Sequence, residues 1–151
     1  MNIKIAQLLL RMSLAAGFLS AVADRFGLWG APGQANVAWG SWDSFVEYVA
    51  LLNPLVPANL IPSLGWVATI AEVAFALGLI IGWKTRWMAV GSALLLASFA
   101  LAMTLTMGIK APLDYSVFPA AAGALLLYLT VPVGNQIHHT VSDALPTPNG
   151  Q

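Results

Sequence analysis

Two ionisable residues, Arg11 and Glu72, lie inside apolar segments of this chain. A charge at the centre of a bilayer costs at least about 2.5–3.5 kcal/mol, so each of them needs a polar partner. Gln7 precedes Arg11 by four residues, and Thr69 precedes Glu72 by three, so each pair shares one face of a helix. We therefore expect Arg11, Glu72, Gln7 and Thr69 to form a buried polar site, either an ion pair or a ligand-binding site.

The depths of the two charges favour direct pairing. Counted from the same side of the membrane, Arg11 lies roughly 12 Å deep and Glu72 roughly 16 Å deep, an offset that an arginine side chain can span. The sequence thus predicts an Arg11–Glu72 ion pair between the first two long helices. Such a pair can be purely structural and only fix the register of the two helices. Alternatively, it can bind a polar ligand, or its carboxylate can take up and release protons. Pairing would lower the pKa of a glutamate, which argues against a simple proton carrier.

Other chemistry is sparse in this sequence. The absence of cysteine excludes disulfides, thiolate metal sites and thiol redox pairs. The only two histidines, His138 and His139, are adjacent, so they point to different faces of a helix and are not expected to hold a metal or a haem. Asp114 is expected to cap a helix or to pair with Lys110. We assign no catalytic residue, no metal site and no intrinsic cofactor from the sequence.

The elements that carry these residues are apolar and long. Of the 151 residues, 59% are hydrophobic and 8% are charged, with equal numbers of acidic and basic side chains. This composition excludes an ordinary soluble domain and a nucleic-acid-binding surface, and makes the lipid bilayer the natural solvent. The sequence predicts an all-α membrane protein, a four-helix antiparallel bundle in one domain (1–133), followed by a polar C-terminal tail (134–151). The expected spans are 3–23, 62–83, 87–108 and 116–133.

Two features modify this plan. A short amphipathic helix is expected at 42–52 in the first extracytoplasmic loop, capped by Ser41, with apolar and acidic residues on opposite sides. The residues at 21–23 also resemble a signal-peptidase site. Because Arg11 interrupts the apolar run that a signal peptide would need, we expect the first span to be retained rather than cleaved.

Basic residues predict the orientation. Lys4, Lys84 and Arg86 fall on one side of four spans, and Arg25 and Lys110 on the other. Because cytoplasmic loops are enriched in Lys and Arg, both termini are expected in the cytoplasm.

Small residues recur at intervals of four in every span, which predicts close packing of the helices. They include Gly17 in the first span and Gly78 and Gly82 in the second. The GxxxG match formed by Gly78 and Gly82 fits packing within the bundle or the contact surface of a homo-oligomer.

An arginine in the first helix, Glu72 in the second, and the following stretch from Gly78 to Arg86 (GLIIGWKTR) together resemble the DoxX family of small bacterial membrane proteins. The segment 108–118 (GIKAPLDYSVF) is similar to a loop in one branch of that family, and the resemblance covers most of residues 5–130. It implies a multi-pass protein of the bacterial inner membrane that works with redox systems. DoxD-like relatives are subunits of a thiosulfate:quinone oxidoreductase, and other members associate with oxidative-stress enzymes. The Trp-rich loop around Trp29, Trp39 and Trp42 departs from the family pattern.

These observations support three hypotheses. The first is a membrane module of a quinone-linked oxidoreductase or oxidative-stress complex, with a bound quinone beside Arg11 and Glu72 and a redox enzyme subunit as partner. The second is a small proton-coupled transporter that works as a dimer. The third is a scaffold subunit without a ligand.

Overall fold

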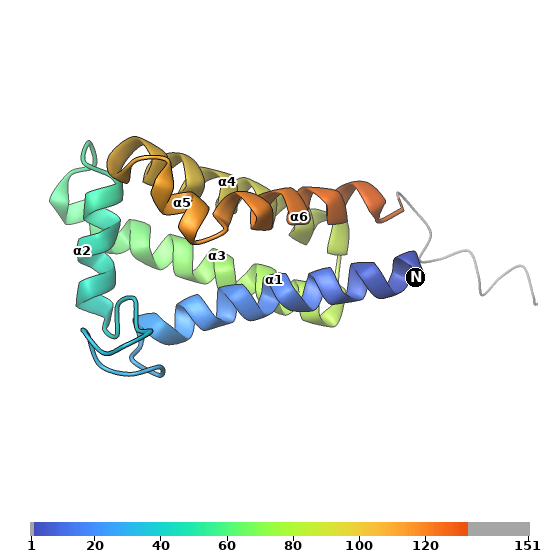
Figure 1. The fold of residues 1–151 in the computed structure, drawn as a ribbon, viewed down its shortest axis with the longest axis horizontal. Coiled ribbons are helices and arrows are strands. Elements are labelled where there is room, and N and C mark those ends of the chain that lie inside the picture. Colours follow the sequence, from blue (N-terminus) through green and yellow to red (C-terminus); the bar gives the residue numbers. More distant parts are fainter. Residues whose placement is uncertain (1, 133–151) are drawn as a thin grey trace, which may run out of the picture.

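The computed structural model describes residues 2–132. The predicted tail, with His138 and His139, lies outside these residues. Throughout the described part the regular structure is helical. The long helices run along the long axis of the molecule, and α2 (Trp42–Leu52) lies across one end (Figure 1). In chain order the elements are α1 (Ile3–Arg25), α2 (Trp42–Leu52), η1 (Ala58–Leu60), α3 (Ile61–Ile81), α4 (Thr85–Met107), α5 (Lys110–Asp114) and α6 (Val117–Thr130).

Three helices are long and apolar enough to cross a membrane. They are α1, the continuous η1–α3 segment and α4, with mean hydropathies of 1.6, 2.1 and 2.0 in their most apolar windows. The chain is therefore a multi-pass membrane protein in contact with the lipid bilayer. The fourth expected span corresponds to α6, which has 14 residues and a length of about 21 Å, less than the roughly 30 Å of a hydrocarbon core. The predicted count of four spans is thus not confirmed.

Local sequence determines where the helices begin and end. The Asn2 side chain accepts a hydrogen bond from the Lys4 amide at the start of α1. At the start of α2, which covers the residues expected for the loop helix, Ser41 accepts one from the Ser44 amide. Helix α3 ends at Ile81, and the following residue, Gly82, takes the left-handed conformation (φ 79°) that glycine adopts without steric cost. These caps satisfy backbone groups that a helix leaves unpaired at its ends.

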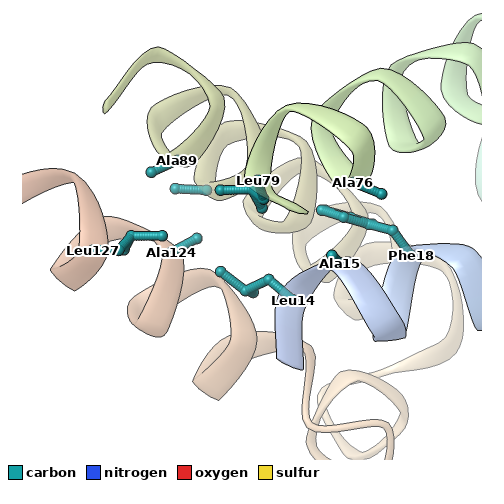
Figure 2. Close-up of a cluster of buried hydrophobic side chains, with 9 residues drawn as sticks. Leu14, Ala15, Phe18, Ala76, Leu79, Ala89, Ala124 and Leu127 are labelled. Atoms are coloured by element: carbon teal, nitrogen blue, oxygen red, sulfur yellow. The ribbon is translucent and has the colours of Figure 1, made fainter. Parts of the chain in front are cut away.

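The main core lies where α1, α3, α4 and α6 meet, and Figure 2 shows its side chains converging from these four helices. Leucine and phenylalanine side chains fill it, and alanines let the backbones approach. Its members are Leu14, Ala15, Phe18, Ala76, Leu79, Ala89, Ala93, Ala124 and Leu127. We call the end of the bundle where α1 begins the N-terminal end, and the opposite end, crossed by α2, the α2 end.

The predicted close packing over small residues holds in part of the bundle. A Cβ atom added to Gly78 would lie 2.5 Å from the Met88 sulfur, and one added to Gly91 would lie 2.6 Å from the Phe75 ring. At Gly17 the result is different, because an added Cβ would meet no atom within 4 Å. The close packing over small residues therefore holds between α3 and α4, whereas α1 is open around Gly17.

Candidate functional site: a buried ion pair beside a membrane cavity

The central polar contact joins the last residue of α1 to the middle of α3. Arg25 Nη2 lies 2.7 Å from Glu72 Oε1, and Arg25 Nη1 donates to Thr69 Oγ1, also at 2.7 Å. The Thr69 hydroxyl in turn donates to the Gly65 carbonyl, one helical turn earlier, at 2.8 Å. Arg25 and Glu72 are 2% and 1% exposed, so both charges are removed from solvent and lipid. The attraction between the two charges offsets the free-energy cost of burying them, which an isolated charge would bear in full.

Aromatic rings from the loop and α2 cover the Arg25 guanidinium. Its central carbon lies 4.0 Å from the centroid of the Phe45 ring and 5.4 Å from that of Trp39. The negative face of an aromatic ring attracts a cation, most strongly where water is excluded. Phe45 also belongs to a second apolar cluster, with Val49 and Ile61, that attaches α2 to the start of α3. Helix α2 therefore closes the α2 end of the bundle directly over the ion pair.

The predicted Arg11–Glu72 pair is wrong, because Arg11 interacts with the C-terminal end of α3. Its Nε donates to the Leu79 carbonyl at 2.7 Å and its Nη2 to the Ile80 carbonyl at 3.1 Å. The last carbonyls of a helix lack intrahelical partners and carry a partial negative charge, so they accept from a cation readily. Arg11 is satisfied there, and Glu72 is paired by Arg25 instead.

The four expected site residues divide between the two ends of the bundle. Thr69 and Glu72 lie together beside Arg25, as their spacing on one helix face predicts. Gln7 and Arg11 lie toward the N-terminal end, where the Gln7 amide donates to the Thr130 carbonyl at 2.9 Å and ties α1 to α6. From its place in the sequence, Arg25 was expected beyond the first span, on the side of the membrane opposite Lys4, and was not included in the site.

The Asp24 carboxylate bonds to the loop that follows α1 and not to the adjacent Arg25. It accepts from the backbone amides of Ala38 at 2.8 Å, Trp39 at 3.3 Å and Gly40 at 3.1 Å, and the residue is 6% exposed. The loop between α1 and α2 is thereby held against the end of α1. Adjacent residues of one helical turn thus have separate tasks: Asp24 fixes the loop, and Arg25 fixes α3.

A cavity of about 1390 Å³ adjoins the ion pair. Its wall is mainly apolar and comes from α1, α2, α3, α4 and α6, with members such as Phe18, Val49, Leu64, Phe99, Met103 and Ala120. Arg25, Glu72 and Asp24 are among the residues that line it. Pockets for small ligands measure about 300–1,000 Å³ and combine apolar walls with a few polar groups. This cavity is larger than that range and has the same mainly apolar lining, so it has room for a small ligand with part of an apolar chain.

Tyr48 adds a neutral hydroxyl to the cavity lining. Burial, and to a lesser degree the proximity of Tyr115, raises the pKa of Tyr48 above its ordinary value of 10.0. The phenol therefore stays protonated at all physiological pH values and can donate a hydrogen bond.

The model of the family described as "Methylamine utilisation protein MauE" matches residues 3–116, three quarters of the chain. This chain belongs to the MauE family. No curated protein and no solved structure matches it. The resemblance to DoxX proteins concerns a related kind of small membrane protein, and membership of that family is not confirmed.

The MauE match covers the whole polar site. Arg25, Glu72, Thr69 and the aromatic cover from Trp39 and Phe45 all lie within the matched residues, whereas α6 lies beyond them. In the described part of this MauE-family chain, no three histidine, cysteine, aspartate or glutamate residues lie close enough together to hold a metal ion. What the arrangement offers chemically is hydrogen bonding and charge inside an apolar cavity.

Proposed function

We propose that this MauE-family protein is a membrane module of an oxidoreductase system, and that it binds a membrane-soluble quinone in the cavity beside Arg25 and Glu72. The family's link to methylamine utilisation supports a role beside an amine-oxidising enzyme. The chain has no cysteine, so thiol–disulfide exchange falls to a partner subunit. Its own contribution is to hold a ligand or a partner in the bilayer.

The observation that carries this proposal is the cavity with its buried ion pair. A quinone has a flat ring with two carbonyl groups, which accept hydrogen bonds, and the ring carries an apolar tail. The cavity supplies apolar walls for such a molecule, and Arg25 and Tyr48 supply donors for its carbonyls. The proton-coupled transporter is disfavoured by the same contact, because Glu72 is engaged by a permanent cation rather than free to exchange protons.

Mass spectrometry of the protein purified in mild detergent or nanodiscs tests the proposal. We expect a quinone to copurify with the wild-type chain in near-stoichiometric amount. A Gly17→Leu variant should lose it, because Gly17 lines the cavity and an added Cβ meets no atom within 4 Å, so the larger side chain competes with the ligand for this space. Ala16→Leu is the matched control, since Ala16 is exposed on the same helix and does not line the cavity. Bare wild-type protein would refute quinone binding and leave a scaffold subunit.

We further propose four spans in the inner membrane, with both termini in the cytoplasm. Lys4, Lys84 and Arg86 lie at the N-terminal end of the bundle, whereas Lys110 lies at the α2 end. Arg25 is neutralised by Glu72, so it no longer weighs against this orientation. Because the chain lacks cysteine, single cysteines at position 33, 84 or 135 can be labelled with a membrane-impermeant reagent without background. Positions 84 and 135 should be labelled from the cytoplasmic side and position 33 from the opposite side. If position 135 is labelled from the same side as position 33, the fourth span is overturned.

A further inference from the structure

Two polar atoms of the ion pair are left without a partner. Among the described residues, Arg25 Nε and Glu72 Oε2 are the buried side-chain polar atoms that make no hydrogen bond. Each belongs to a residue at least nine-tenths buried, and each residue lines the large cavity. A buried polar group without a partner is destabilising, and native proteins leave very few of them. Because both residues line the cavity, a ligand bound there is the available source of the missing hydrogen-bond partners.

The chemistry of the two atoms restricts what that group can be. Arg25 Nε carries a hydrogen and needs an acceptor, whereas the carboxylate oxygen of Glu72 needs a donor. A carbonyl oxygen satisfies only the arginine, and an ammonium group satisfies only the glutamate. A hydroxyl group accepts and donates at the same time, so it matches both.

The cavity also determines what is attached to the hydroxyl. Near the N-terminal end α1 and α6 are in contact, since a Cβ added to Gly123 would lie 3.1 Å from Leu10. Toward the α2 end α1 continues past the start of α6 (Figure 1), and cavity-lining residues of α1 there, such as Gly17 and Ser20, are exposed. This side of the bundle faces lipid in a membrane-embedded protein. An apolar chain can therefore leave the cavity between α1 and α6 while its head group stays at Arg25 and Glu72.

We infer that the cavity selects an amphiphile whose head group carries a hydroxyl, and that, within the quinone-binding role proposed above, it prefers the reduced quinol to the oxidised quinone. A quinol hydroxyl donates to Glu72 Oε2 and accepts from Arg25 Nε. A quinone carbonyl leaves the Glu72 oxygen unpaired. A module with this preference retains the product of quinone reduction, or supplies quinol to a partner that oxidises it.

Direct binding measurements on the full chain in nanodiscs test this inference. The probes are a decyl benzoquinol kept reduced under anaerobic conditions, the corresponding quinone, the dimethyl ether of the quinol, and a diacylglycerol as a hydroxyl-bearing lipid without a ring. We expect the quinol to bind about tenfold tighter or more than the quinone and the ether, because of these three compounds only the quinol can satisfy both orphan atoms. Gly17→Leu should abolish binding and Ala16→Leu should preserve it.

A Glu72→Gln variant tests the direction of the hydrogen bond. The amide nitrogen of glutamine donates, so a correctly folded variant should lose the preference for the quinol or reverse it. If this variant fails to fold, the comparison of quinol with its ether in the wild-type chain decides the matter alone.

The outcomes separate this inference from the proposed function. Equal or tighter binding of the quinone overturns the hydroxyl preference and leaves quinone binding intact. Binding of diacylglycerol without either ring compound supports the hydroxyl site and overturns the quinone. If no probe binds, water alone satisfies the two atoms, and both proposals are overturned.

Discussion

The assignment of Arg25, rather than Arg11, as the partner of Glu72 has a measurable energetic consequence. Replacing one member of a buried ion pair leaves the other charge uncompensated and costs about 3–5 kcal/mol. Arg25→Met and Glu72→Met should each destabilise the protein by this amount. Arg25→Met also removes the bond to Thr69 and the contact with the Phe45 ring, so its cost should lie at the upper end. Methionine keeps similar volume in an apolar environment, so the loss reflects charge rather than a cavity.

The double variant carries the decisive prediction. With both charges replaced by apolar side chains, no uncompensated charge remains, and the cost should fall well below the sum of the two single costs. We expect a coupling energy of about 3 kcal/mol between positions 25 and 72. The free energy of unfolding can be measured by SDS titration of mixed micelles, followed by the fluorescence of the six tryptophans.

A second cycle with Arg11→Met and Glu72→Met is the matched control. Arg11 is bonded to the carbonyls of Leu79 and Ile80, about two helical turns from Glu72, so its effect should add to that of Glu72→Met within about 0.5 kcal/mol. Strong coupling in the Arg11 cycle, together with additivity in the Arg25 cycle, would refute the arrangement described here.

Three further predictions concern the loop and its surroundings. Asp24→Ala removes three hydrogen bonds to backbone amides, so it should destabilise the loop by about 3 kcal/mol and accelerate hydrogen exchange at residues 38–40, with Asp24→Asn intermediate. In thermal unfolding, Gly40→Ala should destabilise the protein more than Gly33→Ala. Both glycines have a positive φ, which costs about 1–2 kcal/mol for an alanine. Of these two positions, only at Gly40 would the added Cβ also clash, since it would lie 2.5 Å from the Pro32 nitrogen. Equal effects would mean that this close approach is absent. Because the pKa of Tyr48 is raised in the folded protein, its contribution to stability is complete below pH 10 and is lost as the pH rises through the folded-state pKa. The difference in ultraviolet absorbance between wild type and Tyr48→Phe should show that this tyrosine ionises above pH 10.0. A transition below pH 10 would contradict the prediction.

Features with a local cause were predictable from the sequence. Helix α2 and its Ser41 cap follow from the period of apolar residues and from a serine at the right position. The pairing of Lys110 with Asp114, four residues apart on one short helix, has the same local origin. The apolar spans follow from composition, because only helices satisfy their own backbone in lipid.

The partner of Glu72 could not be predicted in the same way. Depth in the membrane was counted along straight helices, and that arithmetic allowed Arg11 to reach Glu72. It did not include the free carbonyls at the end of α3, which compete for the same guanidinium. It also treated the end of α1 as membrane surface, whereas the loop and α2 fold back over Arg25 and exclude water there. That folding depends on Asp24 and on aromatic contacts between distant segments, which no local pattern encodes.

The position of Arg25 and Glu72 on different helices also orders the events of biosynthesis. Their contact joins residues 47 positions apart, so α1 enters the membrane before its partner on α3 has been made. Until α3 is inserted, Arg25 at the last turn of α1 can remain at the membrane–water interface, where the free-energy cost of a charge is small. Helix α3 is the most apolar of the three long helices, and this offsets the cost of inserting Glu72 alone. The ion pair, and with it the seating of the loop and α2, thus belongs to a late assembly step that follows insertion, in which separately stable helices associate within the bilayer.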